Sequence, residues 1–132
     1  MHKLALVVTL LVSLLFLGAG GGKVFLSYED FAEQAAWATE LEPWQVTVVG
    51  VLELLAAVGL LLALRVRALR WVTIAAPAGL ALLMAGAIGF HVVIGDGAAE
   101  TMPSVVAFIL SAVLLWLRLG PARVAATTPA SE

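Results

Sequence analysis

Four long apolar stretches constrain the fold of this chain more than any other feature of its sequence. A helix needs about 20 apolar residues to cross the hydrocarbon core of a bilayer. We predict spans at about residues 4–26, 44–64, 71–94 and 103–119. Because the bilayer core offers no water, each span must satisfy its backbone hydrogen bonds internally, as a helix does. The predicted fold is therefore an all-α, integral membrane four-helix bundle.

The composition supports lipid exposure over a soluble fold. Of the 132 residues, 63% are hydrophobic and 12% are charged, against about 45–50% and 25% in soluble domains. A soluble fold of this length has too little interior to bury so much apolar surface. We expect one transmembrane bundle over residues 1–119 and a disordered cytoplasmic tail over 120–132, where the sequence is small, polar and contains proline.

The charged residues divide between the two predicted sides of the membrane. All basic residues except Lys23, which lies inside a span, flank one side: Lys3, Arg65, Arg67, Arg70, Arg118 and Arg123. The acidic residues flank the other: Glu29, Asp30, Glu33, Glu40, Glu42, Asp96 and Glu100. Because basic loops stay in the cytoplasm, we expect a multi-pass membrane protein with both termini on the cytoplasmic side.

The N-terminal segment allows a second interpretation. Its Met-His-Lys opening, its apolar run and the small residues Gly18-Ala19-Gly20 also resemble a secretory signal peptide with a cleavage site. Cleavage would leave three helices and an outer N-terminus. The apolar run continues to Leu26, however, and this length favours a span.

The long outer loop over residues 27–42 is predicted to contain a short amphipathic helix. Ser27 followed by Asp30 resembles the start of a helix, and Tyr28 and Phe31 lie at helical spacing. Such a helix would lie on the outer membrane surface. It would act either as a structural cap over the bundle or as a lid over a pocket.

Glu53 is the first candidate site residue. It lies roughly 14 Å below the outer interface if its span rises 1.5 Å per residue. A carboxyl group at such a depth costs about 2.5–3.5 kcal/mol on insertion scales, so it must face protein or water. Gly50, Ala56 and Ala57 surround it on the helix and would admit a neighbouring helix. It is either a proton-titrating or ligand-binding group, or a structural carboxyl bonded to another helix.

Lys23 and His91 complete the set of candidates. Lys23 lies in the outer half of the first span and either pairs with Glu53 or extends to the lipid headgroups. His91 lies at the outer end of the third span, either as an interfacial residue or as part of a polar cavity shared with the other two. The only other histidine is His2, so we expect no metal site.

Small residues predict how the helices pack. The candidate packing positions are Gly18 and Gly22, and Ala78, Ala81, Ala85 and Gly89. Faces of this kind let membrane helices approach closely, within a chain or between two copies in a homodimer. The chain has no cysteine, which excludes thiolate chemistry. It also has no phosphate loop, nucleophile elbow or nucleic-acid patch, so we expect no catalysis by the protein alone, no covalently bound cofactor and no nucleic-acid partner.

Three sequence elements together resemble the DoxX-like family of small bacterial four-helix membrane proteins, over about residues 4–119. They are Gly18–Lys23, Gly50–Glu53 with Gly59–Leu62, and Ala87–His91. The family takes its name from subunits associated with terminal quinol oxidase and thiosulfate:quinone oxidoreductase activity. Lys23, Glu53 and His91 match its recurring polar positions.

The resemblance implies an accessory subunit of a quinone-linked redox system in the bacterial cytoplasmic (inner) membrane, with a quinone as ligand and a membrane redox protein as partner. The chain has no haem-ligand pair within a span, so we do not expect electron transfer by the protein alone. One alternative is a proton-coupled transporter of small hydrophobic cations, since small multidrug exporters of similar size depend on one membrane glutamate. The other is an assembly factor without a ligand.

Overall fold

The computed structural model describes residues 2–127, with side chains for residues 2–120, and all of its regular structure is helical. The helices are α1 (His2–Phe25), α2 (Tyr28–Gln34), α3 (Pro43–Ala63), α4 (Val72–Ile94) and α5 (Ala98–Thr127), with 3-10 helices η1 (Ala36–Glu40) and η2 (Arg67–Leu69). The all-α class is therefore confirmed.

The described residues contain four helical segments that are long and apolar enough to cross a membrane. These are His2–Phe25, Pro43–Ala63, Arg67–Ile94 and Ala98–Gly120. They coincide with the four predicted spans to within a few residues, which confirms a multi-pass membrane bundle.

Helix α5 differs from the prediction at both of its ends. It begins at Ala98 instead of Pro103, because Gly95 ends α4 in a left-handed conformation with φ 81° and Glu100 falls in the first turn of the new helix, where a negative charge is favourable. It also continues to Thr127. The segment 120–127, which we expected to be disordered, is therefore helical, while the rest of the predicted tail lies outside the described residues.

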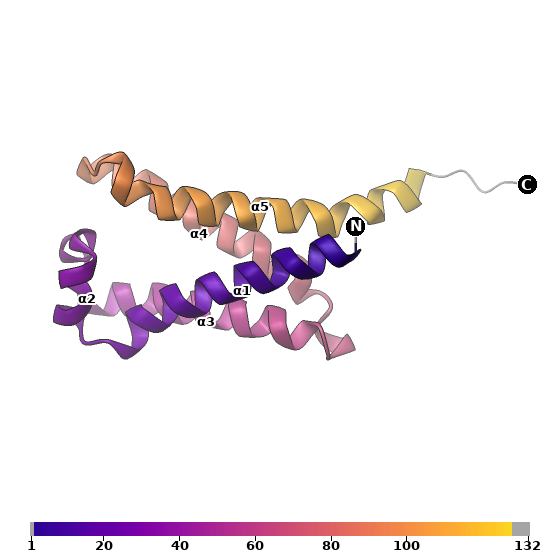
Figure 1. Cartoon of the computed structure of the whole chain (residues 1–132), viewed down its shortest axis with the longest axis horizontal. Coiled ribbons are helices and arrows are strands. Elements are labelled where there is room, and N and C mark those ends of the chain that lie inside the picture. The colour runs from indigo at the N-terminus through magenta and orange to yellow at the C-terminus, as the bar shows by residue number, and fades with distance from the viewer. Residues whose placement is uncertain (1, 128–132) are drawn as a thin grey trace, which may run out of the picture.

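The four long helices form a ring of antiparallel neighbours. Helix α1 packs most closely against α3, and α4 against α5, with smaller contacts between α3 and α4 and between α1 and α5. Figure 1 shows α2 at the same end of the bundle as the turn between α4 and α5, and the start of α1 at the opposite end with the turn between α3 and α4. We call the first the acidic end and the second the basic end, after the charged residues of their loops.

The loop between α1 and α3 folds into a compact cover at the acidic end. Ser27 Oγ accepts a hydrogen bond from the Asp30 amide at 3.1 Å and caps α2, so the short helix expected in this loop is present. The Tyr28 hydroxyl lies 2.9 Å from both Ala38 O and Leu41 O. Because these carbonyls lie in η1 and directly after it, Tyr28 ties the two short helices together.

The centre of the bundle receives a large side chain from each long helix. Phe16, Leu60, Leu80 and Leu114 are all at most 2% exposed. Many other large apolar side chains, such as Leu14, Leu55 and Leu82, point outward and are more than half exposed. An apolar exterior of this kind is what a lipid environment requires.

Candidate functional site

The site is built where α1 and α3 cross at two glycines. A Cβ atom added to Gly20 would lie 2.7 Å from Gly50 O, and one added to Gly50 would lie 2.6 Å from Lys23 Cβ. No residue larger than glycine fits at either position without moving a helix. The crossing therefore depends on Gly20 and Gly50, and it brings the side chains around them within reach of one another.

The predicted packing pair Gly18 and Gly22 does not form this contact. No described atom outside its own stretch of helix lies within 4 Å of a Cβ built on Gly18, and one built on Gly22 would meet the Phe31 ring at 3.7 Å. The prediction that they bring helices together is wrong, because Gly20, between them in sequence, lies on the face of α1 that meets α3.

Lys23 and Glu53 form a direct ion pair beside the crossing. Lys23 Nζ lies 2.8 Å from Glu53 Oε2, and the side chains are only 9% and 2% exposed. Lys23 Nζ also lies 3.4 Å from Ala19 O on its own helix. Lys23 therefore pairs with Glu53 and does not extend to the lipid headgroups, which were the two possibilities left by the sequence. Each charge is buried beside the opposite charge, since leaving one unpaired there is strongly unfavourable.

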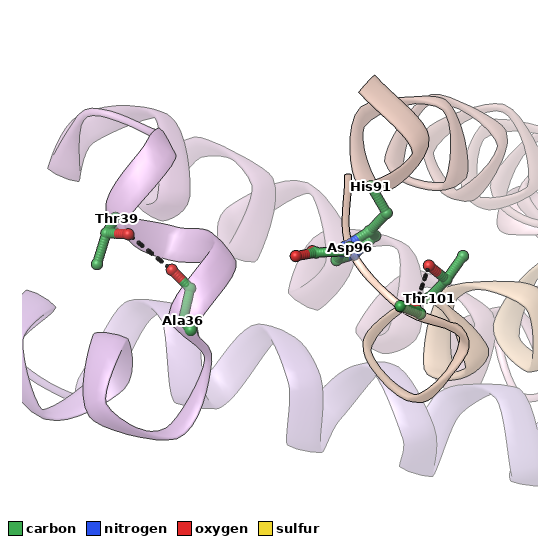
Figure 2. Close-up of polar contacts among 6 residues, drawn as sticks. Ala36, Thr39, His91, Asp96 and Thr101 are labelled. Carbon is green, nitrogen blue, oxygen red and sulfur yellow. Dashed lines mark hydrogen bonds and ion pairs between the residues drawn. The ribbon is translucent and has the colours of Figure 1, made fainter. Parts of the chain in front are cut away.

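His91 is bonded to an acidic residue beyond the end of its own helix. His91 Nδ1 lies 2.5 Å from Asp96 Oδ2, with the histidine side chain 5% and the aspartate side chain 23% exposed. Figure 2 shows the two side chains meeting where the chain turns from α4 to α5, near Thr101. The left-handed Gly95 makes this turn, and the Asp96 amide donates to His91 O at 3.0 Å. The aspartate thus fixes the orientation of the buried ring.

Trp37 of η1 connects the two polar groups. Its ring meets Phe31, Phe90 and His91 edge-on, with centroid distances of 5.7, 6.5 and 5.9 Å. Lys23 Nζ lies 5.9 Å from the centroids of both the Trp37 and the Phe31 rings, within the range of a cation–π interaction. The cover at the acidic end therefore supplies one aromatic wall of the site.

A cavity of about 490 Å³ lies among these groups. Lys23, Glu53 and His91 all line it, although they come from three different helices. Glu100 and Ser104 of α5 are its other polar lining residues, and the remaining walls are apolar or aromatic. We call this space the acidic-end cavity.

The structure thus brings the three predicted site residues to one cavity, but whether they bind a ligand or a proton stays a prediction. Sequence reasoning missed Asp96 as the partner of His91 and Ser104 as a lining residue. The signal for Asp96 was available: it follows His91 closely and comes after a glycine. Among the described residues, no cluster of three or more His, Asp or Glu side chains has the arrangement of a metal site.

Comparison with protein families agrees with the resemblance seen in the sequence. Residues 7–114 match the model of the DoxX-like family. The match covers well over half of the chain and contains all three candidate site residues. No curated protein and no solved structure matches the chain significantly.

Proposed function

The chain belongs to the DoxX-like family, and we propose that it is an accessory subunit of a quinone-linked membrane redox system that binds a quinone in the acidic-end cavity. The observation that carries the proposal is the convergence of Lys23, Glu53 and His91 on one largely apolar cavity. A few polar groups placed in an apolar pocket are typical of small-molecule sites.

The cavity suits a quinone headgroup in size and in chemistry. Its volume of about 490 Å³ lies within the range of about 300–1,000 Å³ common for small ligands. A quinone ring is flat and presents carbonyl oxygens at its edge. The Lys23 ammonium can donate a hydrogen bond to one carbonyl. Asp96 already occupies His91 Nδ1, so Nε2 is the ring nitrogen that remains for a ligand.

The cavity also offers a place for an apolar tail. Leu82 lines the cavity and is 75% exposed on the outer surface of the bundle. Leu15 likewise lines the cavity and is 38% exposed. A headgroup bound beside Lys23 could therefore leave its isoprenoid tail in the surrounding lipid.

The redox step itself would belong to a partner protein. The chain has no cysteine and only two histidines, which lie at opposite ends of the bundle because one begins α1 and the other is near the end of α4. We therefore assign this protein a role in holding or delivering the ligand. Its partners would be the lipid bilayer, a membrane redox protein and a second copy of itself.

Binding of a short-chain benzoquinone to the purified protein in detergent tests the proposal. We expect saturable quenching of tryptophan fluorescence, because Trp37 lines the cavity, and at least tenfold weaker binding for Glu53→Gln. The matched control is Glu40→Gln, which changes an exposed carboxylate at the same end and should bind normally. If the wild type fails to bind, or if both variants bind equally well, the proposal is wrong.

We also propose that the acidic end faces the outside of a bacterial cytoplasmic membrane. The basic residues of the turn between α3 and α4 support this orientation, because such residues stay in the cytoplasm. Since the chain has no cysteine, single Glu40→Cys and Arg67→Cys variants can be labelled in intact cells with a membrane-impermeant maleimide. We expect labelling of the first alone, and the reverse pattern would overturn the orientation.

Two alternatives make different predictions. A transporter of hydrophobic cations needs a carboxylate free to bind its substrate, whereas Lys23 holds Glu53 at 2.8 Å, which disfavours this function. An assembly factor without a ligand should keep its function in a stable Lys23→Met/Glu53→Leu double variant. A quinone-binding subunit should lose its function in that variant.

A further inference from the structure

A second group of polar side chains is buried on α1 and α5, closer to the basic end. Thr9 and Ser13 of α1 and Ser111 of α5 are each 0% exposed. Arg118 of α5 donates from Nη2 to Thr9 Oγ1 at 2.8 Å. We call these four residues the α1–α5 seam.

Three atoms of the seam have no hydrogen-bond partner within the described part of the chain: Ser13 Oγ, Ser111 Oγ and Arg118 Nε. A hydroxyl group buried in apolar surroundings without a partner is strongly unfavourable. Hydrocarbon offers no partner, whereas water can bond to several polar groups at once. Two unpaired hydroxyls on facing helices, with a guanidinium NH beyond them, have the chemistry of a water-binding site.

The seam continues the acidic-end cavity toward the basic end. Phe16 of α1 and Ala107 of α5 line that cavity. Ser13 and Ser111 lie three and four residues farther toward the basic end on the same two helices, which is about one helical turn. The bonded pair of Thr9 and Arg118 follows in the same direction. Buried polar groups thus occur at successive turns of α1 and α5, from the level of the cavity to an arginine near the basic end.

We propose that the α1–α5 seam binds water and connects the acidic-end cavity to the solution at the basic end, so that protons exchange with that side. A serine hydroxyl can accept a hydrogen bond from one water and donate to the next, which lets a proton pass while the hydroxyl itself is restored. This inference is independent of the identity of the cavity ligand.

Cysteine reactivity tests the proposal in lipid vesicles, because a thiol reacts with N-ethylmaleimide through its thiolate, and thiolates form in water. The cysteine-free chain allows single Ser13→Cys and Ser111→Cys variants. The matched controls are Val12→Cys, buried at 0% exposure beside Ser13, and Leu14→Cys, 67% exposed on the outer surface. We expect both seam cysteines to react at least tenfold faster than either control. Equal rates would overturn the proposal.

A pH gradient across vesicles of uniform orientation then identifies the side to which the seam connects. The labelling rate should rise when the pH at the basic end is raised through the ordinary thiol pKa of about 8.5. It should not change when the pH at the acidic end alone is raised. A rate that follows the pH at the acidic end would contradict the proposed connection.

Serine-to-alanine variants decide the question if the cysteine variants do not fold. If water bonds to the hydroxyls, Ser13→Ala and Ser111→Ala each remove a hydrogen bond, and the melting temperature falls by about 2–4 °C. If no water bonds to the hydroxyls, the alanine variants lose a buried polar group that had no partner, and this stabilises the protein. An unchanged or higher melting temperature in both variants would therefore overturn the proposal.

Discussion

The bundle holds two buried polar regions, and they differ in how fully their polar side chains are paired. At the acidic end, Lys23 and Glu53 neutralise each other directly at 2.8 Å, across the close α1–α3 interface. Toward the basic end, where α1 contacts α5 less extensively, Arg118 donates to Thr9 Oγ1, but Ser13 Oγ and Ser111 Oγ have no hydrogen-bond partner among the described residues. The difference indicates that the close approach at Gly20 and Gly50 lets Lys23 and Glu53 pair fully, whereas the α1–α5 interface leaves two buried hydroxyls unpaired among the described residues.

The largest effect is expected from breaking the ion pair on one side. Glu53→Leu leaves the Lys23 ammonium buried without its partner, and removal of one member of a buried pair costs about 3–5 kcal/mol of stability. Unfolding of the purified protein by denaturant measures this loss. A loss in the free energy of unfolding below about 1 kcal/mol would mean that Lys23 leaves the site easily. The ion pair would then not be held more firmly than the polar groups toward the basic end.

The double variant Lys23→Met/Glu53→Leu sharpens the same point. Because both charges are removed together, we expect most of the stability lost in Glu53→Leu to return, as for other buried pairs replaced by apolar residues. The coupling energy from the double-mutant cycle should then exceed about 2 kcal/mol. Additive effects would show that the two side chains act independently.

The next largest effect is expected at the helix crossing. Gly50→Ala places a Cβ atom 2.6 Å from Lys23 Cβ, which forces α1 and α3 apart and should cost about 1–3 kcal/mol. Gly18→Ala is the matched control, since its Cβ would meet no described atom within 4 Å. It should be neutral or stabilising by up to about 1 kcal/mol, because alanine favours a helix. Equal destabilisation of both variants would contradict the assigned crossing.

A smaller effect is expected in the seam. Thr9→Val keeps the shape of the side chain but removes the oxygen that accepts the Arg118 hydrogen bond, so we expect a loss of about 1–2 kcal/mol in the same unfolding measurement. Thr47→Val is the control, because Thr47 is exposed and its hydroxyl bonds only to Pro43 O of its own helix. A loss of stability in Thr9→Val no greater than in Thr47→Val would contradict the hydrogen bond between Arg118 and Thr9.

The smallest effect is expected in the cover over the acidic end, a feature that the seam lacks. Tyr28→Phe removes the hydroxyl that ties α2 to Ala38 O and Leu41 O and should cost about 0.5–1 kcal/mol. Because the loss is local, amides of η1 should exchange with deuterium faster while those of α3 do not change. Thr39→Ala, at an exposed hydroxyl in η1 (Figure 2), should alter this exchange far less.

The four spans could be read from the sequence because their length and apolar composition determine them almost alone. The three site residues could be found for a related reason: an ionisable side chain inside a span must have a specific environment. The start of α5 could not be placed, since Pro103 is a common helix start and the turn at Gly95 depends on its left-handed conformation. Which glycine faces α3 also required the helix rotation, which sequence spacing alone does not determine.

Nothing in the sequence predicted the α1–α5 seam. Serine and threonine are common in membrane helices, and Ser13 and Ser111 are far apart in the chain. Only the folded bundle shows that both hydroxyls are buried. The importance of Trp37 to the cavity likewise depends on how η1 folds over the acidic end, which the spacing of residues in the loop does not determine.

The account depends most on the buried contact between Lys23 and Glu53, and solid-state NMR in lipid bilayers tests it directly. The chain contains only two lysines, Lys3 and Lys23, so their side-chain nitrogens can be distinguished. We predict a strong dipolar coupling between Lys23 Nζ and Glu53 Cδ, as the 2.8 Å contact to Oε2 requires, and none from Lys3. A Lys23 nitrogen without coupling to Glu53 would contradict the account.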